Sequence, residues 1–147
     1  MIRGVRIRAA KAVDLAAVLE VLDICSLKYK VAEASTHLYH LAVLGKQPIG
    51  CVCGEVHGET VVIRAVAVLP EYRDQRIATH LVGAVLMRAR ANGCKSAALF
   101  TTRHPSFFAR YGFSLSSPEQ LPEEIRIAKE FHRRFSARTY CMCRRLD

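Results

Sequence analysis

The stretch from residue 61 to residue 93 constrains the fold of this chain more than any other. Residues 61–69 form an apolar, largely β-branched run that favours a strand, and Pro70 ends it because proline has no N–H for a ladder. From Ile77 onward, apolar residues recur at the spacing of one helical face, and Gly93 supplies a helix stop. The apolar helix positions are 77, 78, 81, 82, 85, 86 and 89. The stretch therefore predicts a strand, a sharp loop and an amphipathic helix.

The loop 73–76 joins this strand to this helix and contains two arginines, Arg73 and Arg76. It brings backbone N–H groups to a helix N-terminus, where unsatisfied donors and the helix dipole favour negative charge. Such a position is suited to hold an anion, most often a phosphate. The sequence thus predicts an anion site at this loop.

The length of 147 residues suits a single domain, residues 1–147, and a hydrophobic content of 51% excludes a disordered protein. No apolar run reaches the ~18 residues that a membrane-spanning helix needs, so we expect no membrane partner. The start of the chain alternates basic and apolar residues like a strand and lacks the long apolar region of a signal peptide. We therefore expect a cytoplasmic protein.

The net charge of +9 favours anionic partners: a phosphorylated cofactor, nucleic acid or acidic substrates. Basic residues are spread along the chain and become denser near its end, at Arg126, Lys129, Arg133, Arg134, Arg138, Arg144 and Arg145. Interleaved aromatic residues and a nucleic-acid-binding motif are missing, so a solvated basic face is favoured over a nucleic-acid surface. A homodimer is compatible with the sequence.

The cysteine pattern raises the question of a metal. Cys51 and Cys53, and likewise Cys141 and Cys143, place two thiols on one face of a predicted strand. Four thiolates can hold zinc in principle, but structural zinc sites take ligands from C-x-x-C turns rather than from mid-strand C-x-C pairs. We expect buried, reduced thiols here and at the two remaining cysteines, and no metal.

The rest of the chain predicts further strands and helices. Strands are expected at 3–9, 38–44, 49–56, 95–101, from 113 to 115 and at 137–144, and helices at 14–27, 105–111 and 119–135. Asp14 can cap the first helix, whose apolar residues are Leu15, Val18, Leu19, Leu22 and Ile24. Short Gly- or Pro-containing turns between strands 38–44, 49–56 and 61–69 favour antiparallel hairpins. The pattern predicts an α+β fold with one mixed sheet.

Three motifs resemble those of a known family. They are Val66-Ala-Val-Leu-Pro-Glu-Tyr-Arg-Asp-Gln-Arg-Ile-Ala-Thr-His-Leu81, Thr101-Thr-Arg103 and Phe107-Phe-Ala-Arg-Tyr-Gly-Phe113. They resemble the GCN5-related N-acetyltransferases (GNAT), and the resemblance covers nearly the whole chain. The run 98–103, together with Leu121-Pro122 and a closing Arg138-Thr-Tyr-Cys-Met, is similar to the acetyltransferase domain of bacterial N-acetylglutamate synthases.

The resemblance implies a mostly antiparallel, twisted sheet, flanked by helices, in which two central parallel strands splay apart around acetyl-CoA. Those strands would be 61–69 and 95–101, with backbone groups of the former pairing with the pantetheine arm and the loop wrapping the pyrophosphate. The implied cofactor-binding residues are Val66, Ala67, Val68, Arg73, Asp74, Gln75, Arg76, Ile77, Ala78, Thr79, Thr101, Phe107, Phe108 and Arg110.

One position departs from the family signature, because Arg76 stands where the loop has its first glycine. Glycine permits close backbone approach to a phosphate and unusual φ angles. An arginine in helical φ/ψ could still offer its N–H, and its guanidinium adds charge-assisted contacts. We expect weaker or differently placed cofactor; the alternative is a vestigial cofactor loop on a surviving fold.

The acid–base groups implied by the resemblance are displaced. Many relatives carry a glutamate on the central strand, where this chain has Val62 and Arg64, so Glu55, Glu59 or a water relay is the candidate base. The acid of many relatives is a tyrosine at the position of Phe108. Tyr111 and Ser106 are the candidate replacements, although Tyr111 is equally well explained as a packing residue.

Arg64 shares a predicted strand face with Val62, Val66 and Val68, so its charge needs a partner. It binds a substrate carboxylate, together with Lys28, or forms a salt bridge to an internal acid, or extends its charged end to solvent. The segment after the first helix lacks the arginine-rich stretch of glutamate-acetylating relatives. We therefore expect transfer from acetyl-CoA to a small amine, with a glutamate-like amino acid as first choice. The alternatives are a protein N-acetyltransferase, a non-catalytic CoA-binding regulator and, more distantly, a nucleic-acid-binding module.

Overall fold

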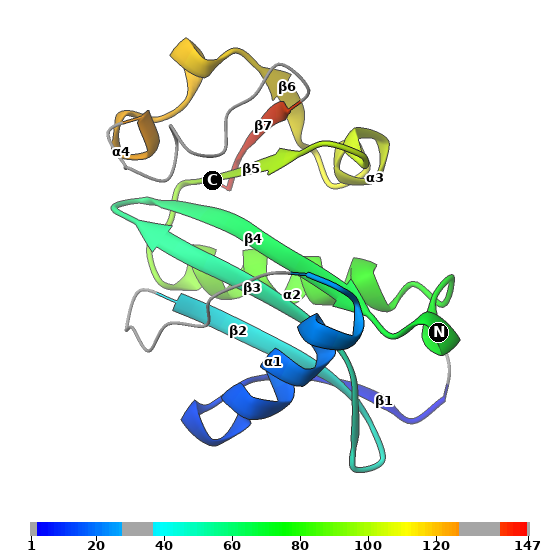
Figure 1. The fold of residues 1–147 in the computed structure, drawn as a ribbon. Helices are drawn as coiled ribbons and strands as arrows, with labels where there is room; N and C mark the ends of the chain where they lie inside the picture. The colour runs from blue at the N-terminus through cyan, green and yellow to red at the C-terminus, as the bar shows by residue number, and fades with distance from the viewer. Residues whose placement is uncertain (1–2, 28–36, 127–138, 147) are drawn as a thin grey trace.

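The computed structural model describes residues 3–27, 37–126 and 139–146, and Figure 1 shows its fold. The strands are β1 (Val5–Ala9), β2 (His37–Leu44), β3 (Gln47–His57), β4 (Thr60–Val68), β5 (Ser96–Thr101), β6 (Ser114–Ser116) and β7 (Tyr140–Arg145). The α-helices are α1 (Leu15–Ile24), α2 (Ile77–Ala91), α3 (Pro105–Ala109) and α4 (Glu123–Arg126). Short 3-10 turns lie at Ala12–Asp14, Pro70–Tyr72 and Pro118–Gln120.

The described strands form one sheet in the order β1-β2-β3-β4-β5-β7-β6. Neighbours are antiparallel except β4 and β5, which run parallel because α2 crosses over between them. Strands β2, β3 and β4 form the predicted meander through two short turns. The prediction of an α+β fold with a mixed, mostly antiparallel sheet is confirmed.

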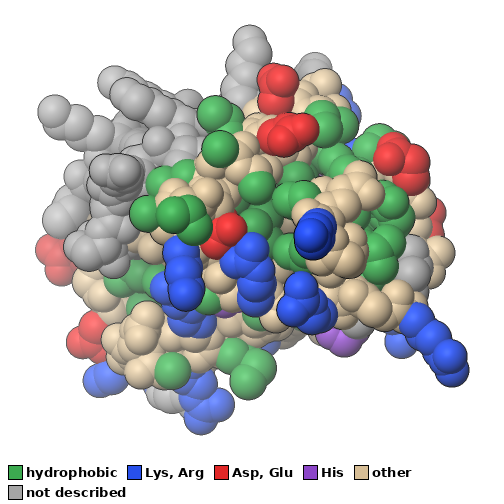
Figure 2. All heavy atoms as spheres, turned by 90° about the horizontal axis from the view of Figure 1, so that it is seen from below, with side chains coloured by type: hydrophobic (Ala, Val, Ile, Leu, Met, Phe, Trp, Pro, Cys, Tyr) green, Lys and Arg blue, Asp and Glu red, His purple; other side chains and the backbone are tan. Residues whose placement is uncertain are grey.

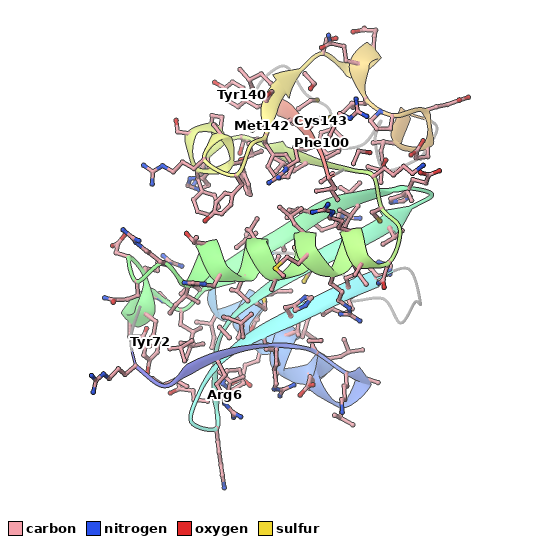
Figure 3. The ribbon with its side chains drawn as sticks, turned by 180° about the vertical axis from the view of Figure 1, so that it is seen from behind. Arg6, Tyr72, Phe100, Tyr140, Met142 and Cys143 are labelled. Atoms are coloured by element: carbon pink, nitrogen blue, oxygen red, sulfur yellow. The ribbon has the colours of Figure 1, made fainter. Side chains whose placement is uncertain are left out.

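Helices cover the two faces of the sheet. In Figure 1, α1 lies in front of β2 and β3 and α2 lies behind them; Figure 3 shows α2 from its own side. The α2 residues at 77, 81, 82, 85, 86 and 89 are buried, as the apolar spacing predicts, and position 78 is half-buried. Gly93, with φ of +95°, follows the end of this helix. The main core therefore lies between α2, the central strands and α1.

The first helix differs from its prediction. Asp14 does not cap it with a side-chain hydrogen bond; its carboxylate instead accepts bonds from the Lys11 N–H and the Arg8 guanidinium. Val18, Val21 and Leu22 are buried, whereas Leu19 and Ile24 are half exposed, at 50% and 53%. The helix is shorter than the predicted range, and fewer of its residues are buried than the prediction gave. The buried face includes Val21, which the prediction omitted.

The C-terminal part of the sheet has a small core of its own, made by Val62, Ala98, Leu121, Ile125 and Cys141. Figure 3 shows the labelled side chains of Phe100 and Met142 in this part, above α2. The helix predicted over 119–135 is a 3-10 turn and the short α4 within the described residues, and positions 127–138 lie outside them. The predicted burial of thiols is confirmed at Cys51, Cys53, Cys94 and Cys141, while Cys25 and Cys143 are half-buried.

Candidate active site

The parallel strands β4 and β5 separate halfway along their length. Their ladder pairs Thr60 with Ser96 and ends at Ile63 and Leu99, although β4 continues to Val68. Figure 1 shows the two strands close together at one end and diverging toward α3 and the start of α2. The splay expected for the central parallel strands is therefore present.

This separation leaves backbone groups of β4 without a neighbouring strand. The Leu69 N–H donates to the Ile49 carbonyl of β3 at 2.8 Å, and backbone groups alternate between the two edges of a strand. Those of Ala67 consequently face β3, and those of Val66 and Val68 face the side that β5 has left. The Val68 carbonyl fits this alternation, since it accepts bonds from Arg73 Nε at 2.9 Å and Cys25 Sγ at 3.4 Å.

A β-bulge at Arg64 marks the point of separation. Cys53 pairs with Ala65 and Gly54 with Ile63, so Arg64 is the extra residue of the bulge. The register therefore places Val66 and Val68 on the opposite face from Val62. The expectation that Arg64 shares a face with Val62, Val66 and Val68 is wrong for the last two, because it assumed unbroken alternation along the strand.

Two residues of the loop before α2 adopt the left-handed conformation that favours glycine. Asp74 and Arg76 both have φ of +63°, and Arg76 is the N-cap residue. The expectation of helical φ/ψ at Arg76 is therefore wrong. The Arg76 side chain makes no capping hydrogen bond, and the first hydrogen bond of α2 runs from the His80 N–H to the Arg76 carbonyl. The N–H groups of Ile77, Ala78 and Thr79 precede that bond and point out of the helix end.

The Glu55 carboxylate is the centre of a buried polar cluster on the α1 face of the sheet. Its Oε2 contacts the Arg64 guanidinium, and His37 Nε2 lies 3.3 Å from the same oxygen. Its Oε1 is hydrogen-bonded to His57 Nε2. The four side chains come from β2, β3 and β4, and the Glu55 side chain is 9% exposed. We call them the Glu55 cluster.

The neighbours of Glu55 keep it ionised. The hydrogen bond from His57, followed by the charge of Arg64, lowers the pKa of Glu55 to about 2, although burial acts in the opposite direction. Of the predicted roles of Arg64, the salt bridge to an internal acid is the one present in this structure. An anionic group this strongly stabilised is a weak proton acceptor by itself.

The candidate acids lie on or just after α3. Ser106 is exposed on this short helix, and Tyr111 follows it with its ring tilted against Phe107 at a centroid distance of 5.2 Å. Phe108 is buried and packs edge-on against both Phe107 and Phe113. Phe108 is therefore a core residue, while Tyr111 is half-buried at the rim of the same aromatic group.

The remaining predicted residues are spread more widely. Thr101 Oγ1 accepts the backbone N–H of Arg103 and of His104 and so shapes the turn into α3, and Arg110 is exposed after it. Glu59, the other candidate base, lies in the exposed β3–β4 turn, 3.3 Å from the Lys95 ammonium. Lys28 lies outside the described residues.

Sequence reasoning missed the two histidines of the Glu55 cluster. His57 follows Glu55 by two residues on the same strand, which places both side chains on one face, and this spacing could have indicated the contact. His37 required the β2–β3 register, in which it pairs directly with Glu55. No local pattern contains that pairing.

A shallow hollow of about 360 Å³ lies away from this site, between β6, β7 and the start of β5. It is lined by Ser96, Gly112, Ser114, Gln120, Pro122, Cys143, Arg144 and Arg145. Figure 2 shows the opposite end of the molecule, where Lys and Arg side chains lie among hydrophobic and neutral surface with an acidic side chain between them. On this face basic side chains form no continuous stripe.

The described residues contain no group of three or more His, Cys, Asp or Glu side chains arranged to hold a metal ion. None of their helices is both long enough and apolar enough to cross a membrane.

Comparisons with known proteins add to this geometry. The model of the acetyltransferase (GNAT) family matches residues 14–113. Among proteins of curated function, no sequence matches the chain significantly.

Solved structures share the fold at low sequence identity. N-acetylglutamate synthase from Neisseria gonorrhoeae, complexed with coenzyme A and N-acetyl-glutamate, superposes with a TM-score of 0.78 at 23% identity. That match covers 100% of this chain and 36% of the synthase, so this chain spans about a third of that protein. The ribosomal-protein-S18-alanine N-acetyltransferase from Escherichia coli gives a TM-score of 0.75 at 12% identity, covering 97% of this chain and 94% of that one. Rv2747 from Mycobacterium tuberculosis, in complex with CoA, superposes with a TM-score of 0.73 at 19% identity. That match covers 95% of this chain and 98% of Rv2747.

Proposed function

This chain belongs to the acetyltransferase (GNAT) family, and from that membership we propose that it acetylates the amine of a small acidic metabolite, with a glutamate-like amino acid as first candidate. The acetyl donor is acetyl-CoA, as in the family. The observation that carries the proposal is the end of the β4–β5 ladder at Ile63 and Leu99. It leaves an extended backbone edge of β4 beside the N-terminus of α2. The edge suits the pantetheine arm of the donor, and the helix N-terminus suits its pyrophosphate.

The pantetheine arm would lie along β4 and pair with the backbone groups of Val66 and Val68 like an added strand. The pyrophosphate would accept the N–H groups at the start of α2, where the helix dipole favours its charge. The left-handed Arg76 directs its own N–H within the same turn, as a glycine there would do. Its exposed guanidinium adds a charge-assisted contact.

The chemistry is direct transfer from sulfur to nitrogen. The neutral amine attacks the thioester carbonyl, whose oxygen would be stabilised by a backbone N–H near Val68. The thiolate then leaves and takes a proton, for which Tyr111 is the first candidate and Ser106 the second, because a phenol is the stronger acid. Glu55 on β3 contacts Arg64 of the bulge. It is the candidate for the group that receives the proton of the amine.

The choice of a glutamate-like substrate rests on two observations. The synthase complexed with N-acetyl-glutamate superposes over the full length of this chain. The net charge of +9 favours an anionic metabolite over a cationic one.

A protein N-acetyltransferase is the second candidate. The S18-alanine N-acetyltransferase shares the fold over 97% of this chain, with a TM-score of 0.75. An N-terminal amine of a protein and the amine of an amino acid differ little at the reacting atom. They differ in the groups that surround it.

The test is release of free thiol from acetyl-CoA in the presence of glutamate, aspartate, glutamine, neutral amino acids and short peptides with a free N-terminus. We expect the highest kcat/KM with an acidic amino acid. Turnover confined to peptides would replace this proposal by the second candidate. Tight coenzyme A binding in calorimetry without turnover on any amine would identify a CoA-binding regulator instead.

A further inference from the structure

The carbonyl oxygen of Val68 lies on the edge of β4 that β5 has left, and two side chains donate to it. Arg73 Nε is 2.9 Å from this oxygen and Cys25 Sγ is 3.4 Å from it. Arg73 Nη2 also lies 3.8 Å from the Cys25 sulfur, so the three groups are in mutual contact. Val68 is 8% exposed, and a buried carbonyl needs a donor where no neighbouring strand supplies one. The C-cap residue of α1 and the loop before α2 thus take the place of a strand at this point.

The contacts of Arg73 do not balance its charge. Among the described residues, its guanidinium contacts the Val68 carbonyl and the Cys25 thiol, and neither group is a carboxylate. The residue as a whole is exposed. A guanidinium has five N–H donors in a planar fork that matches the geometry of a phosphate. The described contacts therefore leave its capacity to pair with an anion unused.

Arg73 lies between the two parts of the proposed donor site. It follows the 3-10 turn Pro70–Tyr72 and precedes Ile77, the first residue of α2. Figure 1 shows this loop joining the end of β4 to the start of α2. An arginine anchored here has the open edge of β4 on one side and the free N–H groups of α2 on the other. The first would meet pantetheine and the second the pyrophosphate.

We propose that Arg73 exchanges its contacts when the donor binds, and that it thereby selects donors that carry a diphosphate. This inference rests on the proposed function, in which pantetheine pairs with β4. In the free protein the guanidinium occupies the Val68 carbonyl. In the complex an amide N–H of pantetheine donates to that carbonyl, and the guanidinium turns to the pyrophosphate in a charge-assisted contact. A thioester of pantetheine alone has to displace Arg73 without offering it an anion.

The exchange differs from two simpler roles of Arg73 in its effect on affinity. If the side chain only braced the loop, its loss would weaken the binding of every donor alike. If it only obstructed the edge of β4, its loss would strengthen the binding of every donor. In the exchange, its loss removes a cost that all donors bear, together with a contact that only a diphosphate receives. The affinities for donors with and without the diphosphate should therefore move in opposite directions.

The test measures the dissociation constants of coenzyme A and of pantetheine, the same arm without phosphates or nucleotide, under reducing conditions. Wild type is compared with Arg73→Ala. We expect coenzyme A to bind the variant about 10-fold more weakly, because hydrogen bonds between charged groups are lost. Pantetheine should bind it about 3-fold more tightly, because its amide no longer competes with a hydrogen bond to a neutral carbonyl. Calorimetry measures the first ligand, and ligand-observed NMR titration measures the second.

Three further variants serve as controls. Arg90→Ala removes the same charge at the far end of α2, more than a Debye length away in physiological salt, and should change neither dissociation constant. Arg73→Lys keeps the charge without the planar fork and should recover part of the coenzyme A affinity. Arg73→Met keeps an unbranched side chain without donors and should repeat the result of Arg73→Ala. Thermal unfolding shows whether each variant is folded.

The outcomes separate this inference from the proposed function. Folded wild-type protein that binds neither ligand contradicts the proposed function. Wild-type binding of coenzyme A, with both affinities lowered alike in Arg73→Ala and Arg73→Met, contradicts only the exchange and leaves Arg73 as a brace of the loop. Weaker coenzyme A binding with no gain in pantetheine binding also overturns it, since Arg73 is then a phosphate contact alone. Unchanged or tighter coenzyme A binding overturns it as well, because the guanidinium then makes no contact with the diphosphate.

Discussion

Arg76 holds a backbone conformation that costs an arginine free energy. Its φ of 63° and ψ of 18° lie in the left-handed region, where a Cβ approaches the following carbonyl oxygen. The position lies between the 3-10 turn Pro70–Tyr72 and α2, so the chain has to bend there whichever residue is present. The strain is retained beside a predicted phosphate site, which is typical of functional loops.

Replacing this residue tests the strain directly. Arg76→Gly should raise the free energy of unfolding by about 0.5–1 kcal/mol, because relief of strain exceeds the added entropy of the unfolded chain. Urea denaturation measures the change. The control is Arg90→Gly in the exposed last turn of α2, where glycine should instead cost about 1 kcal/mol. A destabilised Arg76→Gly would contradict the strained conformation.

At the scale of elements, α2 depends on glycines in β3 for its close approach to the sheet. A Cβ at Gly50 would lie 3.0 Å from the Ala67 carbonyl oxygen and 3.2 Å from Leu81 Cδ1. Gly54 would place one 3.0 Å from Val85 Cγ2. The helix and β4 therefore pack directly on the backbone of β3, and α2 carries the predicted phosphate site at its N-terminus.

Two Gly→Ala substitutions should act with opposite signs. Gly50→Ala should destabilise the protein by about 1–3 kcal/mol, because a backbone carbonyl cannot move aside as a side-chain tip can. Gly83→Ala, in the middle of α2 with no atom within 4 Å of the added Cβ, should stabilise it by about 1 kcal/mol through helix propensity. Chemical denaturation of both variants measures the difference. Equal effects would contradict the close packing of α2 on β3.

The elements themselves followed from local pattern, but their irregularities did not. Strand β4 and helix α2 begin and end within a residue or two of their predicted limits, because period and stop residues are written locally. The bulge at Arg64 has no such signal, since it arises from the pairing of β3 with β4. The bulge places Arg64 beside Glu55, and it turns Val66 to the face of the sheet opposite Val62. The predicted site changed accordingly.

At the scale of the whole molecule, buried ionisable groups set the stability of the fold in acid. His40 is 5% exposed, and burial, with a smaller effect of the Arg88 charge, lowers its pKa to about 4. Its Nδ1 has no hydrogen-bond partner among the described residues. Because the folded pKa lies below the unfolded value of 6.5, stability is complete above pH 6.5 and is lost as pH falls toward 4.

Protonation of His40 should lower the free energy of unfolding by about 3 kcal/mol as the pH falls from 6.5 to 4. Glu55 adds to it at lower pH, because its folded pKa of about 2 lies below the unfolded value of 4.5. Urea midpoints measured from pH 7.5 to pH 4 test the trend. His40→Leu should flatten the slope between pH 6.5 and 4, and an unchanged slope would show that His40 is not the titrating group.

The sequence by itself determined the order and type of the elements, the family resemblance and the loop that precedes α2, because hydrophobic period, turn residues and helix stops are local properties of the chain. Only the tertiary structure decided which side chains meet: the β2–β3 register brought His37 to Glu55, and the bulge in β4 brought Arg64 to the same carboxylate. The physical reason is that strand register is fixed by packing across the whole sheet, and a shift by one residue changes the face of every side chain beyond it.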